Sequence, residues 1–127
     1  MKCRLFNGTD NSAKSLAAKR WILKSIGGDK IELSKDLPFL NFDREKMSAG
    51  GNGGCNVFGG SFEVKDNSIK FGDMFSTMMA CEHENRMSIE QRFFDGLRSA
   101  DRFEINNGRL ILYKGDDPVL EFAAADK

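Results

Sequence analysis

Cysteine and histidine side chains are the first candidates for chemistry in this chain. Cys81 and His83 are two residues apart, so their side chains point to the same side of an extended segment. A thiol next to an imidazole is the arrangement of a nucleophilic catalyst. However, His83 is the only histidine among 127 residues, and it lies between Glu82 and Glu84, which is typical of a solvent-exposed loop. We therefore expect no catalytic residue in this segment.

The sequence also predicts no metal site and no cofactor. Zinc sites use four Cys or His ligands, whereas this chain has three cysteines (Cys3, Cys55 and Cys81) and one histidine. The glycine-rich run from Gly50 to Gly60 lacks the Gly-Lys-Ser/Thr ending of a phosphate-binding loop. Asn56 stands where a third glycine would complete a dinucleotide-binding motif. We expect these glycines to let a strand bend or approach another backbone closely.

The composition is that of a globular domain without excess charge. Hydrophobic residues make up 40% and charged residues 30%, and 19 basic side chains balance 19 acidic ones. Proteins that bind nucleic acids or anionic membranes gain affinity from surplus Lys and Arg, so we expect neither activity. The sequence contains no apolar run of about 20 residues that could span a bilayer, and no signal-peptide hydrophobic region.

Short apolar stretches separated by turn residues predict a mainly β fold. Residues 1–19 show little periodicity, so we expect an N-terminal tether there and one folded domain over residues 20–125. Asn107-Gly108 is typical of the type I′ turn that joins antiparallel strands. The alternation of apolar residues predicts strands at residues 21–26, 30–33, 37–42, 57–64, 69–71, 103–105, 110–113 and 119–123.

One segment predicts a helix instead. Ser88 and Gln91 have the spacing of a capping box, so we expect the helix to begin at Ser88. Apolar and charged residues then separate onto two faces of the helix. The apolar face comprises Ile89, Phe93, Phe94, Leu97 and Ala100, and the charged face Glu90, Arg92, Asp95 and Arg98. The predicted fold is a small antiparallel β barrel or half-barrel, plugged or covered by one helix before the last strands.

Five short motifs together resemble the META domain (HslJ-like) family. The most specific are Gly53-Gly54-Cys55-Asn56-x-Phe58-x-Gly60 and, later, Ser76-Thr77-Met78-Met79-Ala80-Cys81. The others are Trp21-x-Leu23, Pro38-x-Leu40-x-Phe42 and Glu90-Gln91-x-Phe93. The resemblance covers residues 16–123. It implies a small antiparallel β domain with one helix before the last strands, and it brings no enzymatic activity.

The resemblance implies a function in the bacterial cell envelope. Members of the family are mostly envelope proteins or lipoproteins linked to heat stress and antibiotic tolerance. We therefore expect a non-enzymatic, monomeric protein that binds an unidentified protein or small ligand, or that gives structural support. The alternative is a small-ligand carrier or thiol-dependent enzyme with a pocket near Cys55, Cys81 and His83. The expected location is the envelope or periplasm if a signal peptide has been removed from the chain, and the cytoplasm otherwise.

The resemblance also makes Cys55 and Cys81 the natural disulfide pair, because they lie in its two most specific motifs. The alternative is two buried free thiols that behave as small apolar side chains. With three cysteines, at least one stays outside any intramolecular disulfide. Cys3 is either the lipid-bearing cysteine of a lipoprotein, which would be the only route to a membrane, or an incidental exposed thiol.

Four methionines close to Phe71 and Phe75 belong either to the core or to a binding surface. They are Met74, Met78, Met79 and Met87. We favour the core, because methionine commonly fills irregular gaps there. If some of them are exposed, they become the best candidate for a groove that binds a peptide or a protein.

Overall fold

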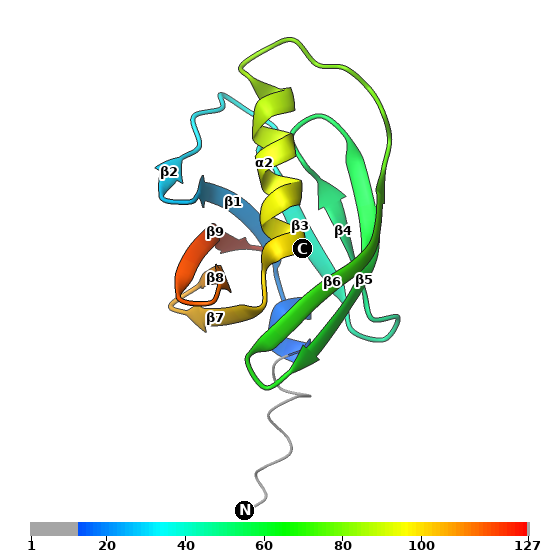
Figure 1. Cartoon of the computed structure of the whole chain (residues 1–127), viewed down its shortest axis with the longest axis vertical. Coiled ribbons are helices and arrows are strands. Elements are labelled where there is room, and N and C mark those ends of the chain that lie inside the picture. Colours follow the sequence, from blue (N-terminus) through cyan, green and yellow to red (C-terminus); the bar gives the residue numbers. More distant parts are fainter. Residues whose placement is uncertain (1–12, 127) are drawn as a thin grey trace, which may run out of the picture.

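A computed structural model describes residues 13–126, which form an antiparallel sheet and a helix (Figure 1). A short helical segment at residues 13–17 comes first. The elements that follow are β1 (Arg20–Ile26), β2 (Asp29–Lys30), β3 (Phe39–Asp43), β4 (Ser48–Asn52), β5 (Val57–Lys65), β6 (Ser68–Ser76), α2 (Arg86–Ser99), β7 (Arg102–Asn106), β8 (Arg109–Lys114) and β9 (Asp117–Ala125).

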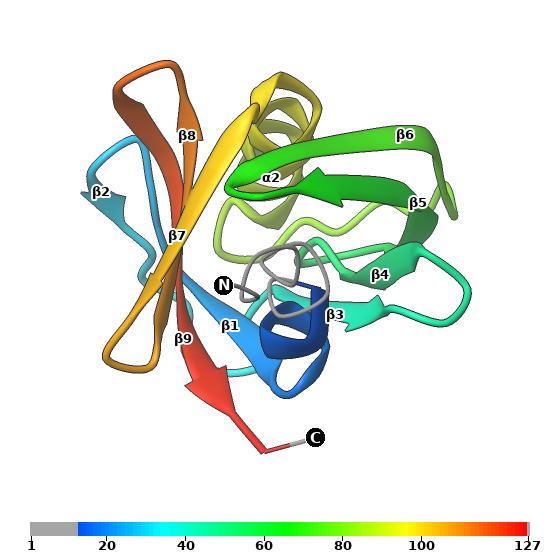
Figure 2. The ribbon, with the colours of Figure 1, turned by 90° about the horizontal axis from the view of Figure 1, so that it is seen from below.

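The sheet closes on itself as a ring. Its nine strands lie in the order β2-β1-β3-β4-β5-β6-β7-β8-β9, and β1 pairs with β9 as well as with β3 (Figure 2). Between β6 and β7 the ladder of the described residues has a single pair, Ser68 with Arg102. The helix α2 packs against β1, β6, β8 and β9. The predicted fold, a barrel-like antiparallel sheet with a helix before the last strands, is confirmed.

Phenylalanine rings join the helix to the inside of the sheet. Phe93 of α2 is fully buried, and its ring centroid lies 5.5 Å from that of Phe58 on β5 and 6.0 Å from that of Phe122 on β9. Edge-to-face contacts of this kind stabilise a core beyond the apolar area that they bury. A Cβ atom on Gly96 would lie only 2.8 Å from Cγ of Leu120. The helix and β9 therefore approach each other as closely as a glycine allows.

The hairpin between β7 and β8 has the predicted turn. Asn106 pairs with Arg109, which leaves Asn107 and Gly108 as the two turn residues. Their φ angles are 52° and 76°. Positive φ at both positions is what a type I′ turn requires, and its twist matches that of the flanking strands. The Asn-Gly prediction is confirmed.

The structure has one strand that was not predicted, and it differs from the prediction at another strand and at the start of the helix. The strand β4 (Ser48–Asn52) was not predicted, because its Ala-Gly-Gly core has no apolar alternation. The strand β2 covers Asp29–Lys30 and stops short of the predicted residues 30–33. The helix begins at Arg86, and no side chain caps it, so the predicted capping box at Ser88 is wrong. The chain turns into the helix through Asn85, whose φ is 57°.

The packed structure extends to the N-terminal side of Arg20. Leu16 is fully buried in the core, and its carbonyl oxygen accepts a hydrogen bond of 2.8 Å from the indole nitrogen of Trp21. Packing of this kind supplies the tertiary support that a single helical turn needs. The rest of the predicted tether, residues 1–12, lies outside the described residues. Within residues 13–126 no helix has the length and apolarity to cross a bilayer.

Candidate functional site

The two most specific motifs meet where α2 begins. The turn between β4 and β5 carries Cys55, and the segment after β6 carries Cys81. The two cysteines form a disulfide with their Cα atoms 6.0 Å apart, and Cys55 is buried. Of the two alternatives for this pair, the structure has the disulfide and not two free thiols.

Asn56, next to the disulfide, holds the segment after β6 in place. Its side chain is only 3% exposed. The amide oxygen Oδ1 accepts hydrogen bonds from the Thr77 hydroxyl at 2.8 Å and from the Met79 backbone nitrogen at 2.7 Å. The amide nitrogen Nδ2 donates to the Met79 carbonyl at 3.2 Å and to Oε1 of Glu90 at 2.7 Å. One buried amide thus connects three separate segments.

Glu90 holds the other side of the same turn. Its carboxylate is 4% exposed, and Oε2 accepts hydrogen bonds from the backbone nitrogens of Asn56 at 2.6 Å and Cys55 at 3.1 Å. The prediction that Glu90 lies on the charged, solvent-facing side of the helix is therefore wrong. Burial of its carboxylate is offset because its oxygens receive three N–H donors from this turn.

Two glycines allow the turn to approach the helix. A Cβ atom on Gly53 would lie 2.8 Å from Cγ of Glu90 and 2.9 Å from a ring carbon of Phe94. Gly54 has a φ of 118°, a conformation that side chains with a Cβ rarely adopt. These positions agree with the interpretation of the glycine-rich run as a site of close backbone approach.

The remaining motif residues do not gather into a reactive cluster. Phe58 is buried against Phe93 and Phe94 of the helix. Gly60 lies against the backbone of β6, since a Cβ there would be 2.7 Å from the Gly72 oxygen. Ala80 is exposed, and Cys3 lies outside the described residues.

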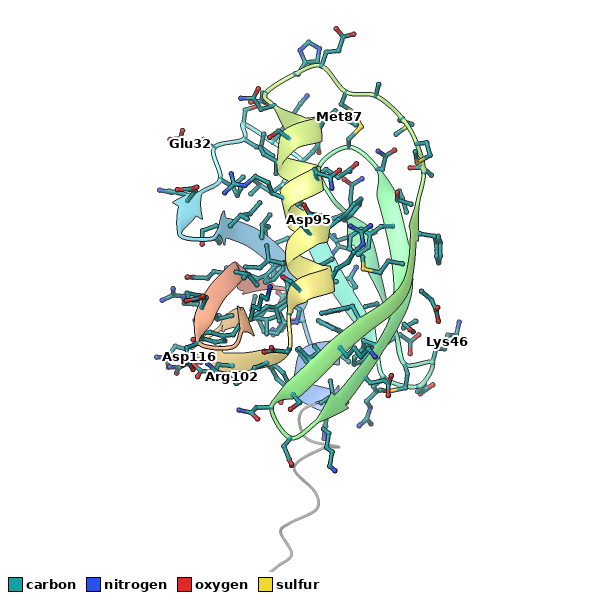
Figure 3. The ribbon with its side chains drawn as sticks, viewed as in Figure 1. Glu32, Lys46, Met87, Asp95, Arg102 and Asp116 are labelled. Carbon is teal, nitrogen blue, oxygen red and sulfur yellow. A yellow bond between two sulfur atoms is a disulfide. The ribbon has the colours of Figure 1, made fainter. Side chains whose placement is uncertain are left out.

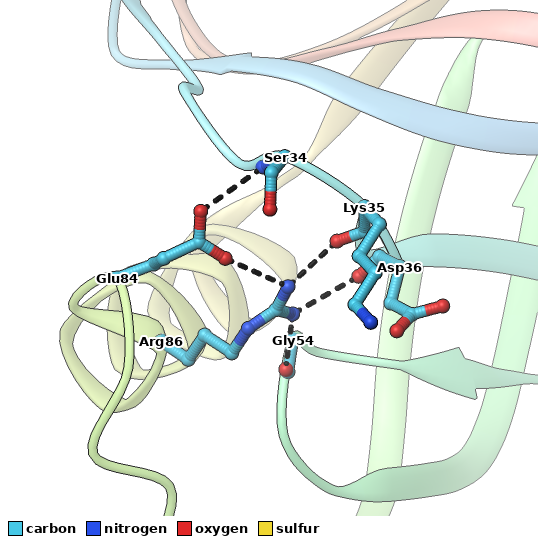
Figure 4. Close-up of polar contacts among 6 residues, drawn as sticks. All are labelled: Ser34, Lys35, Asp36, Gly54, Glu84 and Arg86. Atoms are coloured by element: carbon cyan, nitrogen blue, oxygen red, sulfur yellow. Dashed lines mark hydrogen bonds and ion pairs between the residues drawn. The ribbon is translucent and has the colours of Figure 1, made fainter.

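Arg86 joins the same end of the molecule to the loop before β3, as Figure 4 shows. Its guanidinium is mostly buried and donates to the carbonyl oxygens of Lys35 at 2.6 Å, Gly54 at 2.9 Å and Asp36 at 3.1 Å. It also forms an ion pair of 3.2 Å with Glu84. A planar guanidinium with several donors is suited to holding the loop at residues 35–36 and the turn at Gly54 to the start of the helix.

The contact between Glu84 and the loop before β3 can be tested through the pH dependence of stability. The backbone N–H of Ser34, the Ser34 hydroxyl and then Arg86 hold the pKa of Glu84 below its ordinary value of 4.5. A lowered pKa in the folded state stabilises the fold above the unfolded-state pKa, and this contribution is lost as the pH falls through the folded-state pKa.

We therefore expect Glu84→Gln to lower the free energy of unfolding at about pH 7 and to have a smaller effect at about pH 3, below the ordinary pKa of the carboxyl group. Urea denaturation at both pH values measures the difference. The exposed neighbouring carboxylate in Glu82→Gln serves as the control and should change little at either pH. An effect of Glu84→Gln that is equal at both pH values would show that the charge of Glu84 does not stabilise the fold.

A cleft of about 980 Å³ opens beside the disulfide, and we call it the disulfide cleft. Its lining includes Cys55, Cys81 and His83, together with Arg86 and the loop at residues 34–37. The pocket of the alternative hypothesis is therefore present in the structure. Both sulfur atoms are bonded to each other, however, so neither is the thiolate that a cysteine nucleophile requires. His83 is exposed, and the described residues include no group of three Cys, His, Asp or Glu placed to hold a metal.

The methionines near the site correct another prediction. Met78 is 91% exposed, and Met79 and Met87 are also exposed, so the favoured interpretation as core residues is wrong for these three. Met87 projects outward from the first turn of α2 in Figure 3. Only Met74 packs partly against the core. The backbone of Met79 is held by Asn56, which leaves its side chain directed away from the core.

Sequence reasoning missed the structural role of three polar residues at this site. Asn56 and Glu90 lie in the family motifs, and that position was the available signal. Nothing in the sequence indicated that Arg86 is buried, because it follows a run of polar residues that is typical of a solvated loop. Its burial depends on backbone carbonyls from residues 35, 36 and 54, which only the folded chain brings together.

Similarity to a known protein family extends over nearly the whole chain. A model of the META domain family matches residues 14–127. No curated protein sequence matches the chain.

Solved structures share the fold at low sequence identity. An NMR structure covers 90% of this chain and 95% of its own, with a TM-score of 0.73 and 22% identity. An NMR structure of a protein from Burkholderia xenovorans covers 92% and 88%, with a TM-score of 0.72 and 21% identity. The crystal structure of a DUF4847 family protein from Bacteroides vulgatus covers 91% and 99%, with a TM-score of 0.63 and 13% identity. At these identities the likeness shows the fold alone.

Proposed function

The chain belongs to the META domain family, and from this membership and its Cys55–Cys81 disulfide we propose that it is a non-enzymatic protein of the bacterial cell envelope. It acts by binding a partner or by structural support, as a monomer, in tolerance of heat or antibiotic stress. Cys3 is the proposed attachment site of a lipid anchor.

The single observation that carries the proposal is the Cys55–Cys81 disulfide, which lies next to the hydrogen bonds between Asn56 and Glu90. Disulfides persist in oxidising compartments and are rare in the cytoplasm. The separation of 26 residues between Cys55 and Cys81 corresponds to a stabilisation of about 3.5 kcal/mol in the chain-entropy model. Because the disulfide contributes this much to stability, it supports a location in an oxidising compartment, where the bond forms and persists.

The same bond supports a non-enzymatic function. A cysteine catalyst needs a free thiolate with a base in reach, and here both motif cysteines are joined to each other. The polar groups next to them are already paired, since Asn56, Glu90 and Arg86 bond to the backbone or to each other. The exposed Met78 and Met79 side chains on the adjoining segment supply apolar surface for a partner.

The thiol state in intact cells of the native host tests the location. Free thiols are trapped with a maleimide before lysis, and peptide mapping then assigns the modified cysteines. We expect Cys55 and Cys81 to be unmodified and linked in one disulfide, in the envelope fraction, with a lipid on Cys3; a free Cys3 thiol would contradict the lipid anchor alone. A reduced Cys55–Cys81 pair in the cytoplasmic fraction would contradict the proposal.

Rescue of a strain that lacks the gene tests the function. We expect survival of heat or antibiotic stress to be restored by the wild-type protein and by His83→Ala. The double variant Cys55→Ala/Cys81→Ala should be less stable by about 3.5 kcal/mol and should rescue less well. Loss of rescue in a folded His83→Ala protein would favour an enzyme instead.

A small-ligand carrier is the second candidate, and the disulfide cleft favours it. The cleft has about 980 Å³ of space and borders Cys81 and His83. Ligand sites in proteins commonly have volumes of this order. If a ligand is carried there, native mass spectrometry of protein isolated from its host should show a bound small molecule, and Arg86→Ala should release it. A protein that is isolated without any bound molecule would count against this candidate.

A further inference from the structure

The strand β6 has one edge that is unpaired over most of its length. On one side it pairs with β5 from Ser68 to Ser76. On the other side its ladder with β7 has a single pair, Ser68 with Arg102, next to which the Ile69 nitrogen donates to the Asp101 carbonyl. Figure 2 shows β6 and β7 meeting at one end and diverging. Beyond Ile69, no backbone group within residues 13–126 bonds to this edge.

The far end of this edge offers a donor and an acceptor to solvent. The Thr77 nitrogen donates to the Val57 carbonyl at 3.0 Å, and the preceding Ser76 pairs with Phe58. Hydrogen-bonded and non-bonded pairs alternate along an antiparallel ladder, so the N–H and C=O of Ser76 point away from β5. None of residues 73–76 is buried. An extended polypeptide is the ligand that pairs with such an edge.

A pocket of about 240 Å³ lies between this edge and the helix, and we call it the edge pocket. Its lining includes Met74 and Ser76 of β6 and Phe94 and Arg98 of α2, together with Met78 from the segment after β6. Phe94 is buried, whereas Met78 is 91% exposed. The lining is mostly apolar, so an aliphatic side chain would be removed from water here.

Arg98 is the one charged residue in the lining of the edge pocket. It forms an ion pair of 3.5 Å with Asp95, in which the two side chains are 55% and 63% exposed. Exposed pairs of this kind contribute little to stability, so the guanidinium is free to turn toward another carboxylate. The edge pocket is therefore complementary to an apolar side chain that is followed or preceded by an acidic one.

A second copy of the chain suits this edge less well than a short segment of another protein. Lysines and bulges on edge strands oppose pairing between two copies of a sheet. The strand β6 has both, since Lys70 is exposed and the ladder with β5 shifts register between Gly59 and Ser61. The open edge that follows this irregularity is short, and it lies directly beside the edge pocket.

We propose that the free edge of β6 binds an extended acidic segment of a partner protein. The segment adds as a strand beside Ser76, places an aliphatic side chain in the edge pocket, and places a carboxylate two residues away on Arg98. Side chains two residues apart share one face of a strand, so both reach the helix side. The proposal rests on the proposed function only in describing its partner.

The test is an NMR titration of the ¹⁵N-labelled, oxidised protein with the capped peptide Thr-Glu-Val-Leu-Val-Glu-Thr. A glutamate lies two residues from the leucine on both sides, so the peptide offers the pattern in either direction. We expect saturable shifts of the backbone signals of Met74, Ser76 and Phe94. Hydrogen exchange of the Ser76 amide should be fast in the free protein and at least tenfold slower at saturation, because the amide gains an acceptor.

Two modified peptides test the addition of a strand. One is N-methylated at the leucine and the other at both valines. Alternate N–H groups of a strand face opposite edges, so only one of the two sets faces β6. We expect one modified peptide to bind at least tenfold more weakly and the other to bind like the parent.

Charge reversal tests the contribution of Arg98. The same peptide with lysines in place of the glutamates should bind the wild type about tenfold more weakly, and Arg98→Glu should reverse this preference. Arg44→Glu makes the same change of charge at an exposed residue outside the edge pocket, and it should keep the preference of the wild type. Both variants should melt close to the wild type, because both arginines are exposed.

Four results would overturn the proposal. They are the absence of saturable shifts up to about 10 mM peptide, unchanged binding of both N-methylated peptides, a preference for glutamate that Arg98→Glu retains, and slow exchange of the Ser76 amide in the free protein. The last would show that the edge is already occupied, and slower diffusion at higher protein concentration would identify a second copy. These measurements use the isolated protein, so their failure would leave the thiol state and the rescue experiments unaffected.

Discussion

Replacing Asn56 by Asp is expected to lower the free energy of unfolding by about 4 kcal/mol at neutral pH. The substitution keeps the shape of the side chain and its acceptor for Thr77 and Met79. It replaces Nδ2 by an oxygen that faces Oε1 of Glu90 at 2.7 Å and the Met79 carbonyl at 3.2 Å. Two carboxylates without a proton between them would then share a buried site. Urea denaturation of the oxidised protein measures the loss.

The pH dependence identifies the cause. Protonation of either carboxyl group restores a hydrogen between the two oxygens, so the difference from the wild type should narrow as the pH falls toward about 4. Asn52→Asp is the matched control. It lies in the same turn, and its Oδ1 accepts a bond from the Gly54 nitrogen that an aspartate keeps, so we expect a change within about 0.5 kcal/mol. An Asn56→Asp protein as stable as this control would mean that the Nδ2 bonds are not made.

Replacing Glu90 by Ala is the second large effect, with an expected loss of about 3 to 5 kcal/mol. The backbone N–H groups of Cys55 and Asn56 and the amide of Asn56 would all lose their acceptor inside the protein. Chemical denaturation gives the magnitude. Asp95→Ala on the exposed side of the same helix (Figure 3) is the control and should cost less than about 1 kcal/mol.

A double-mutant cycle with Asn56→Ala then measures the coupling. Because Asn56 and Glu90 share one set of hydrogen bonds, the double variant should lose less stability than the sum of the single variants, by about 1 to 3 kcal/mol. Additive losses would show that the two side chains act independently.

Local sequence patterns predicted much of the fold, because apolar and polar residues alternate along most of the strands. The turn at Asn107-Gly108 and the buried Phe93 and Leu97 follow from the chemistry of neighbouring residues. The strand Ser48–Asn52 does not, since small residues and glycines give no alternation. It is a strand because β3 and β5 lie on either side of it and pair with it.

The candidate site depends on contacts that no local pattern contains. The sequence pattern places Glu90 on the charged face of an amphipathic helix. It is buried because its carboxylate accepts hydrogen bonds from the N–H groups of a turn 34 and 35 residues earlier. The helix start was misplaced for a related reason. The guanidinium of Arg86 holds the first turn to distant carbonyls, and this contact does not require a capping side chain at Ser88.

The pairing of β1 with β9 has a consequence for the order of folding. Arg20 pairs with Ala125, so the ring closes only when nearly the last described residue is in place. Contacts between such distant parts of a chain slow folding, because a long loop must be ordered before they form. Trp21, the only tryptophan, pairs with Ala124 at this seam and is buried. Its fluorescence therefore reports burial at this seam, and a chain emerging from the ribosome stays open until β9 has been synthesised.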